Sequence, residues 1–345
     1  MQQPLNRASH RTRRLIWSSL RFATGIGLLI YLAKSGIIDL KTLDRLLDSW
    51  PISFAAVALM SVDVVMMSLR FCWLLEPHGL HLSLGKSLQL TSVSTLFTTF
   101  LPGSSGGVLA KLFYASKEND RRRAEIAMVV FLDRAVGLFS LLLLSLALVP
   151  IFPRLVWSVV ELRFLVLITV VLAIAMAVGF AVILFNGSWA HRLLRRMLEF
   201  LPWKDLASRM IDAIGFYKGS MRALWAALAA SVLANLSVVC VAALAYFGLA
   251  PSSFSFRVFL VAPMGYIANS LPLTPGGLGV GEEAFNSLFR LTGVGGGADA
   301  LLSWRIWCLP ISVLGFVFYL RGIGRSVHDR GGAAVAALEV EDQVR

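Results

Sequence analysis

Charged side chains are scarce in this sequence of 345 residues: Asp, Glu, Lys and Arg make up 15% of it, against about 25% in a typical soluble domain. Hydrophobic residues make up 57%, and the mean hydropathy is +0.74. A soluble protein with so few charges could not cover its own surface. Apolar stretches of spanning length also exclude a barrel of short alternating strands. The sequence therefore predicts an all-α polytopic membrane protein.

Cysteine is rare, and catalytic signatures are missing. Cys72, Cys240 and Cys308 each lie in an apolar run without the spacing of a metal or redox site, which favours a packing role. The histidines fall in tails or loops, and the sequence contains no G-x-S-x-G, Walker or dinucleotide-binding motif. We therefore expect no enzyme activity, no metal and no cofactor.

Six apolar segments are long enough to span a bilayer: about residues 15–34, 51–75, 124–149, 162–186, 222–249 and 300–320. Two further segments, about 87–116 and 258–291, are interrupted at their midpoints by proline and paired glycines. Each arm of about 15 residues is too short to cross at 1.5 Å per residue. We therefore expect two re-entrant broken helical hairpins. Kinks in ordinary spanning helices are the alternative.

The distribution of Lys and Arg supports this topology, because these residues concentrate in cytoplasmic loops. With the N-terminus inside, the inner segments contain 20 Lys and Arg and the outer segments contain 6. The net charge of +12 thus reflects topology, and no nucleic-acid partner is expected. We predict a protein of the cytoplasmic (inner) membrane with both termini cytoplasmic. Residues 1–14 form a basic tail, 15–325 the transmembrane domain and 326–345 a second tail.

The broken segments belong to an internal repeat. Residues of the same type recur at an offset of 170 or 171, namely Pro102 and Pro272, Gly106-Gly107 and Gly276-Gly277, and Arg134 and Arg305. Each unit is a span, a hairpin and a span, at about 51–149 and 222–320, and the predicted topology makes the units inverted. Inverted repeats with discontinuous helices are typical of transporters, whose binding site lies near the midplane.

Charged side chains at membrane depth are candidates for a binding site. Insertion of each at a helix centre costs about 2.5–3.5 kcal/mol, so each should face the protein interior or a wet cavity. Arg134 and Arg305 are expected to line one central cavity. The second arm of each hairpin follows paired glycines, so free N–H groups and the positive end of the helix dipole suit a phosphate. The predicted substrate-binding residues are Ser104, Ser105, Gly106, Gly107, Lys111, Arg134, Thr274, Gly276, Gly277 and Arg305.

The acidic residues leave two roles open. Glu282 is either the ion-pair partner of an arginine or a proton carrier, and Asp63 and Asp133 are further candidates for a proton or ion-pair site. Asp133 and Arg134 point about 100° apart on a helix, so each is expected to pair with another helix. Arg70, near the predicted cytoplasmic end of its span, either snorkels to the interface or is buried.

These motifs resemble those of the lysylphosphatidylglycerol synthase transmembrane family, the flippase-like membrane proteins, over about residues 15–325. The resemblance rests on four motifs: Leu101-Pro102-Gly103 with Gly106-Gly107, Leu132-Asp133-Arg134, the run from Pro275 to Glu282, and Arg305. Val108 and Lys111 stand where the family has an acidic residue and an arginine. Gly281 stands where the family has an arginine directly before the glutamate. The resemblance implies lipid handling and leaves the lipid open.

The repeat and the resemblance together predict a translocator of an anionic or polyprenyl-phosphate-linked lipid. The alternative is a non-catalytic accessory subunit that presents a lipid to a separately encoded glycosyl- or acyltransferase. A membrane-embedded lipid-modifying enzyme is disfavoured, because no metal or nucleophile constellation is present. The partners implied by the resemblance are an anionic phospholipid, a polyprenyl phosphate or a hopanoid-type lipid.

Overall fold

The computed structural model describes residues 49–100, 105–118, 122–185, 217, 219–249, 255–270 and 280–322. The regular structure of these residues is helical. The predicted first span and both predicted tails lie outside the described residues.

Within the described residues, five stretches are long and apolar enough to cross a membrane. They are α3 (Trp50–Leu75) with the short η1 (Glu76–His78), α6 (Arg123–Leu148) with η3 (Val149–Ile151), α8 (Val160–Phe185), α11 (Met221–Leu249), and α14 (Gly297–Trp307) with α15 (Leu309–Arg321). Five of the six predicted spans therefore have helical counterparts. The predicted last span differs, because it is two helices joined at Cys308. Pro310 has no N–H to donate, so the regular helical hydrogen bonds are interrupted there.

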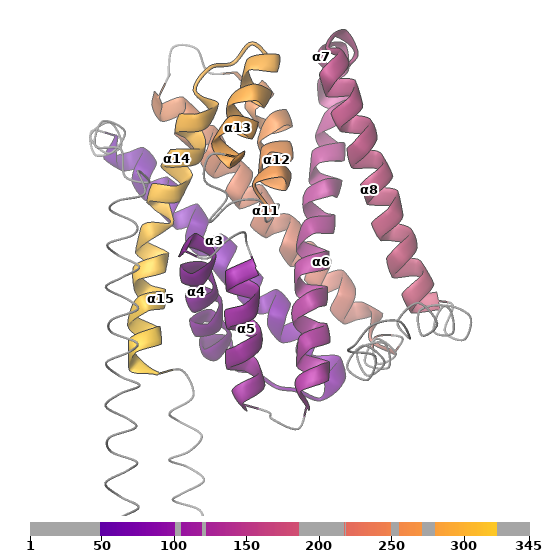
Figure 1. The fold of residues 1–345 in the computed structure, drawn as a ribbon, viewed down its shortest axis with the longest axis vertical. Helices are drawn as coiled ribbons and strands as arrows, with labels where there is room; N and C mark the ends of the chain where they lie inside the picture. The colour runs from indigo at the N-terminus through magenta and orange to yellow at the C-terminus, as the bar shows by residue number, and fades with distance from the viewer. Residues whose placement is uncertain are drawn as a thin grey trace, which may run out of the picture.

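The two broken segments form pairs of short helices. The first pair is α4 (Leu84–Phe100) with α5 (Ser105–Glu118), and the second is α12 (Arg257–Asn269) with α13 (Val280–Leu291). The two helices of each pair pack side by side. Figure 1 shows the first pair in the lower half of the bundle and the second in the upper half. The longest of the four has 17 residues, or about 26 Å, which is less than the roughly 30 Å of hydrocarbon.

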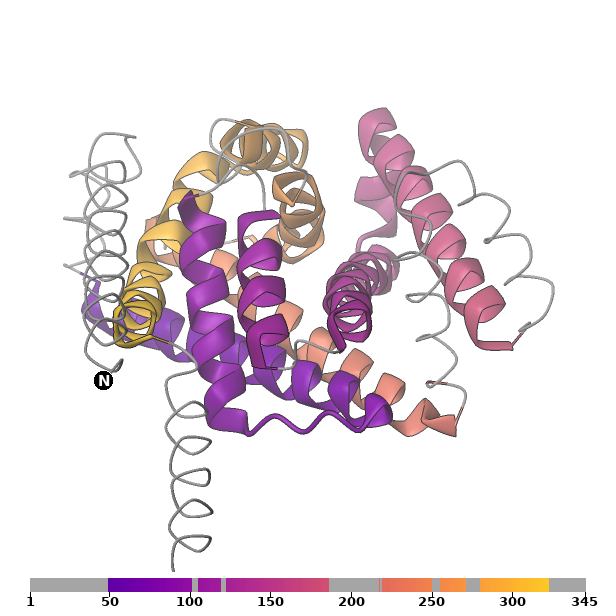
Figure 2. The same cartoon turned by 60° about the horizontal axis from the view of Figure 1, so that its bottom comes forward.

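The two repeat units have matching contacts. Helix α4 packs on α3 and α5 on α6 in the first unit, as α12 packs on α11 and α13 on α14 in the second. Between the units, α3 packs along α11. Helix α4 packs on α15 of the other unit, just as α12 packs on α6. Each pair of short helices is thus held between its own unit and the last helices of the other (Figures 1 and 2).

The exterior of the bundle is apolar. Helix α8, connected to α6 through the short helix α7 (Pro153–Ser158), packs on α6 and exposes a row of large apolar side chains that includes Phe164, Leu167, Ile168 and Val171. Figure 2 shows α8 at the edge of the bundle. Buried apolar side chains form two clusters, one centred on α11, α12 and α14 and the other on the end of α3 and on α4 to α6. The polar side chains described below lie where the two units meet.

Candidate functional site

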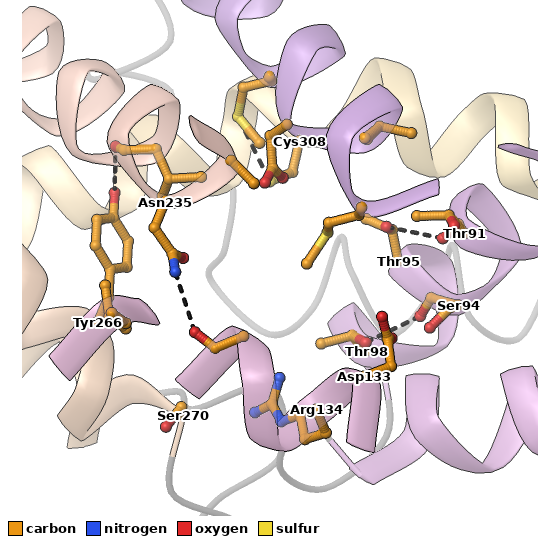
Figure 3. Close-up of a pocket in the computed structure, with 18 of the residues that line it drawn as sticks. Thr91, Ser94, Thr95, Thr98, Asp133, Arg134, Asn235, Tyr266, Ser270 and Cys308 are labelled. Carbon is orange, nitrogen blue, oxygen red and sulfur yellow. Dashed lines mark hydrogen bonds between the residues drawn. The ribbon is translucent and has the colours of Figure 1, made fainter. Parts of the chain in front are cut away.

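A cavity of about 280 Å³ lies where the two repeat units meet. Its wall is formed by α3, α4, α5 and α6 of the first unit and by α11, α12, α14 and α15 of the second. The charged side chains on this wall are Asp63, Arg70, Lys111, Asp133, Arg134 and Arg305. Because cations outnumber carboxylates, the wall has a net positive charge that suits an anionic ligand. Figure 3 shows Thr91, Thr95 and Thr98 on one side of the pocket and Asn235 and Tyr266 on the other.

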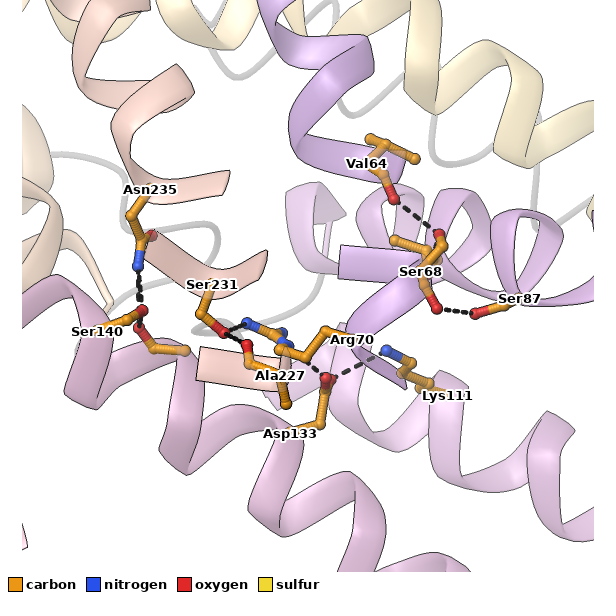
Figure 4. A network of polar contacts seen from close by, with 12 residues as sticks. Val64, Ser68, Arg70, Ser87, Lys111, Asp133, Ser140, Ala227, Ser231 and Asn235 are labelled. Carbon is orange, nitrogen blue, oxygen red and sulfur yellow. Dashed lines mark hydrogen bonds and ion pairs between the residues drawn. The ribbon is translucent and has the colours of Figure 1, made fainter. Parts of the chain in front are cut away.

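Asp133 is the centre of a buried ion-pair network (Figure 4). Its Oδ1 lies 2.6 Å from Arg70 Nε, and its Oδ2 lies 3.0 Å from Lys111 Nζ. Arg70 Nη1 also donates to Ser231 Oγ at 3.0 Å, and Lys111 Nζ lies 3.9 Å from the centroid of the Phe71 ring. The network therefore connects α3, α5, α6 and α11.

The network decides a question that the sequence left open. Arg70 is only 4% exposed, so the interpretation in which it snorkels to the interface is wrong. Lys111 is 6% exposed and donates to Asp133, so it also lies inside the protein. A side chain at position 137 would collide with Arg70, because a Cβ there would be 2.9 Å from Nη1. Gly137 thus lets the guanidinium lie against α6.

Arg305 connects α14 to both helices of the second pair. Its Nε lies 3.1 Å from Glu282 Oε1 at the start of α13, and its Nη2 donates to Asn269 Oδ1, 3.4 Å away, at the end of α12. Arg305 is 5% exposed, whereas the Glu282 side chain is 23% exposed. Of the two roles left open for Glu282, the structure shows the ion pair with an arginine.

Arg134 and Arg305 line the same cavity but have different surroundings. Arg134 is the twelfth residue of α6, about 16 Å from the start of that helix. It is exposed, and its guanidinium borders the cavity (Figure 3). An arginine in the middle of a long apolar helix is expected to face the protein interior or a water-filled cavity, and Arg134 lies on the wall of this one. Of the two arginines, Arg134 is the one more accessible to a ligand in the cavity.

A stripe of hydroxyl side chains on α4 also borders the cavity: Thr91, Ser94, Thr95 and Thr98. Ser94 Oγ donates to Gly107 O at 2.8 Å, Thr95 Oγ1 to Thr91 O at 3.0 Å and Thr98 Oγ1 to Ser94 O at 2.9 Å. The hydroxyl hydrogens of Ser94, Thr95 and Thr98 are used within the protein, so their oxygens remain as acceptors, whereas Thr91 Oγ1 already accepts from Ser68 Oγ at 3.0 Å. This stripe is not among the residues predicted from the sequence. The signal was its spacing of three, four and seven residues, which places all four hydroxyls on one helix face.

The predicted glycine sites are only partly within the described residues. Gly106 and Gly107 lie in the first turn of α5 and are buried. A Cβ at Gly107 would overlap Thr98 Oγ1 and lie 2.6 Å from Ser94 O, so α4 and α5 can meet only at a glycine. Ser105 starts α5, and its side chain is outside the described atoms. The remaining predicted residues, Ser104, Thr274, Gly276 and Gly277, lie outside the described residues, so anion binding at the paired glycines remains a prediction.

A sequence comparison places most of the chain in one family. The family model described as the lysylphosphatidylglycerol synthase TM region matches residues 17–315. No curated protein and no solved structure matches the chain. The match covers every helix that lines the cavity, apart from the last residues of α15.

Proposed function

The chain belongs to the lysylphosphatidylglycerol synthase TM-region family, and from this premise we propose that it moves an anionic or polyprenyl-phosphate-linked lipid between the leaflets of the cytoplasmic membrane. The observation that carries the proposal is the cavity between the repeat units, whose wall has more cations than carboxylates and includes Arg134 and Arg305. The main barrier to lipid crossing is the loss of water around the charged head group. A polar cavity lowers this barrier while the acyl chains stay in the bilayer.

The proposed topology has six spanning helices and two re-entrant hairpins in an inverted repeat, with both termini cytoplasmic. Three observations support it: the short helices of each pair, the opposite halves of the bundle that the pairs occupy, and the matching contacts of the units. Lys117 at the end of α5 and Arg123 at the start of α6 belong to the proposed cytoplasmic end. Arg154 in α7 and Arg290 in α13 belong to the outer end.

Cysteine labelling tests this topology. After replacement of the three native cysteines, cysteine at the exposed position of Lys117 should react with an impermeant maleimide only in inverted vesicles or permeabilised cells. Cysteine at the exposed position of Arg154 should react in intact cells, and so serves as the matched control. Labelling of position 117 from outside would show that the first hairpin crosses the membrane.

Different side chains of the cavity replace different hydrogen bonds between the head group and water. The exposed guanidinium of Arg134 donates to the head-group phosphate in paired, charge-assisted hydrogen bonds. The hydroxyl oxygens of the α4 stripe accept hydrogen bonds from hydroxyl groups of a glycerol or sugar. Arg305, fixed by Glu282, adds positive charge on the opposite unit. Opening of the cavity toward one side and then the other would carry the head group across.

Reconstitution of the purified chain tests the function itself. Proteoliposomes containing it should expose a fluorescent anionic phospholipid or polyprenyl phosphate to an external quencher faster than protein-free liposomes do. A phosphatidylcholine analogue is the matched lipid control and should cross more slowly, because its head group has no net charge. If none of several anionic lipids crosses faster than in empty liposomes, the translocator is contradicted. The accessory-subunit alternative would then be favoured.

A further inference from the structure

Asp63 is a carboxylate at the centre of a spanning helix. It lies 13 residues from the first residue of α3 and 12 from the last, about 18–20 Å from either end. It borders the cavity between the repeat units. Within the part of the chain that the structure describes, Asp63 makes no hydrogen bond and no ion pair. A carboxylate so placed is costly when ionised, and such residues mark ion and proton pathways.

The cavity-lining side chains closest to Asp63 along the sequence carry no charge. Met60, Val64 and Met67 line the cavity on the same helix. The Cys308 thiol, on the wall formed by the second unit, contacts Met60 Sδ at 3.9 Å. Trp304 lines the cavity too, and its buried Nε1–H has no hydrogen-bond acceptor among the described residues. A carboxylate acceptor and an indole donor of one cavity are thus both unsatisfied, as expected where a polar species binds and leaves.

The other acidic groups near the cavity are already paired. Asp133 is held by Arg70 and Lys111, and Glu282 by Arg305. The cavity-facing residues of α4 and α11 are not titratable. The titratable groups that face the cavity from the remaining elements are Arg70 on α3, Lys111 on α5, Asp133 and Arg134 on α6, Tyr266 on α12, and Arg305 and Cys308 at α14. Asp63 is the cavity carboxylate that can change its charge without breaking an ion pair among the described residues.

We propose that Asp63 takes up a proton together with the anionic head group, so that lipid translocation is coupled to a proton gradient. This inference rests on the proposed function. The proton adds to a carboxylate oxygen of Asp63 from water on the acidic side and returns to water on the other side, and no other bond changes. An anionic phosphate in the cavity repels an ionised Asp63, so head-group binding favours protonation, and protonation favours head-group binding to the same degree.

A proteoliposome experiment on the full chain tests the coupling. If one proton accompanies each singly charged lipid, the step is electroneutral, and one pH unit across the membrane should drive up to about a tenfold lipid asymmetry, or about 1.4 kcal/mol. Asp63→Asn should remove the asymmetry, and Asp63→Glu should restore it. Asp299→Asn is the matched control, because Asp299 is exposed in the first turn of α14 and does not line the cavity. It should keep the full asymmetry.

A second measurement reports the proton without requiring transport. Infrared difference spectra of the protein in lipid bilayers, recorded between high and low pH, should contain a carboxyl band that is absent in Asp63→Asn and present in Asp299→Asn. Adding an anionic lipid should move the midpoint of this band to higher pH. If the wild type moves lipid without any response to the pH gradient, or if Asp63→Asn keeps both the response and the band, the coupling proposal is overturned. If the wild type moves no lipid but the band titrates, the proposed function fails while Asp63 stands as a proton site.

Discussion

Replacing Arg134 with glutamine is expected to lower the rate of lipid translocation about 10- to 150-fold. A hydrogen bond to a charged group contributes about 1.5–3 kcal/mol, and this difference in a barrier corresponds to that range of rates. The effect should fall on translocation rather than folding, because Arg134 is exposed on the cavity wall. The rate of leaflet exchange in proteoliposomes, at matched amounts of inserted protein, is the measurement.

Two further variants separate charge from packing. Arg134→Lys keeps the charge but loses the paired geometry of the guanidinium, so its rate should lie between those of the wild type and Arg134→Gln. Arg305→Gln alone would leave Glu282 without its cation, so it is compared with the double variant Arg305→Gln/Glu282→Gln. Translocation at the wild-type rate in Arg134→Gln and in the double variant would show that the head group does not pass these arginines. Loss of membrane insertion in both would indicate a structural role.

The helices could be predicted because bilayer thickness imposes a length on each span. The ends of the five spans within the described residues lie within three residues of their predicted positions. The two segments that contain proline and paired glycines also correspond to pairs of short helices, α4 with α5 and α12 with α13, and Gly106 and Gly107 themselves lie in the first turn of α5. The interruption at Cys308 was missed, because Pro310 stands alone in an apolar run and adds no length to the segment. Mean hydropathy is averaged over the side chains of a whole segment, so it does not register the loss of one backbone N–H.

The site was predicted less completely, because its contacts join residues that are distant in the sequence. The repeat offset placed Arg134 and Arg305 on one cavity, and the structure brings both to its wall. The offset could not show that Arg134 is exposed and Arg305 buried. Glu282, which pairs with Arg305, lies in the second pair of short helices and has no acidic counterpart in the first. The Arg70–Asp133 pair spans 63 residues and depends on how α3 crosses α6. No periodicity along the sequence encodes such a crossing.

Removing the Asp133 carboxylate should destabilise the fold by about 3–5 kcal/mol. In Asp133→Ala, Arg70 and Lys111 would remain buried side by side without their shared anion, and uncompensated buried charge has about this cost. The free energy of unfolding, measured by denaturant titration in mixed micelles, is the readout. Asp299→Asn serves as the control, since it removes an exposed carboxylate from a helix end and should change stability by no more than about 0.5 kcal/mol.

Replacing the whole network tests whether the fold or the function requires its charges. A buried ion network can often be exchanged for apolar residues of similar size without loss of stability. The triple variant Arg70→Met/Lys111→Met/Asp133→Leu should therefore regain most of the stability lost in Asp133→Ala. It should still translocate an anionic lipid more slowly than the wild type, because the cavity wall loses two cations for one carboxylate. A stable triple variant that works at the wild-type rate would show that the network only holds α3, α5 and α6 together. Wild-type stability in Asp133→Ala would show that Arg70 and Lys111 find other partners when Asp133 is removed.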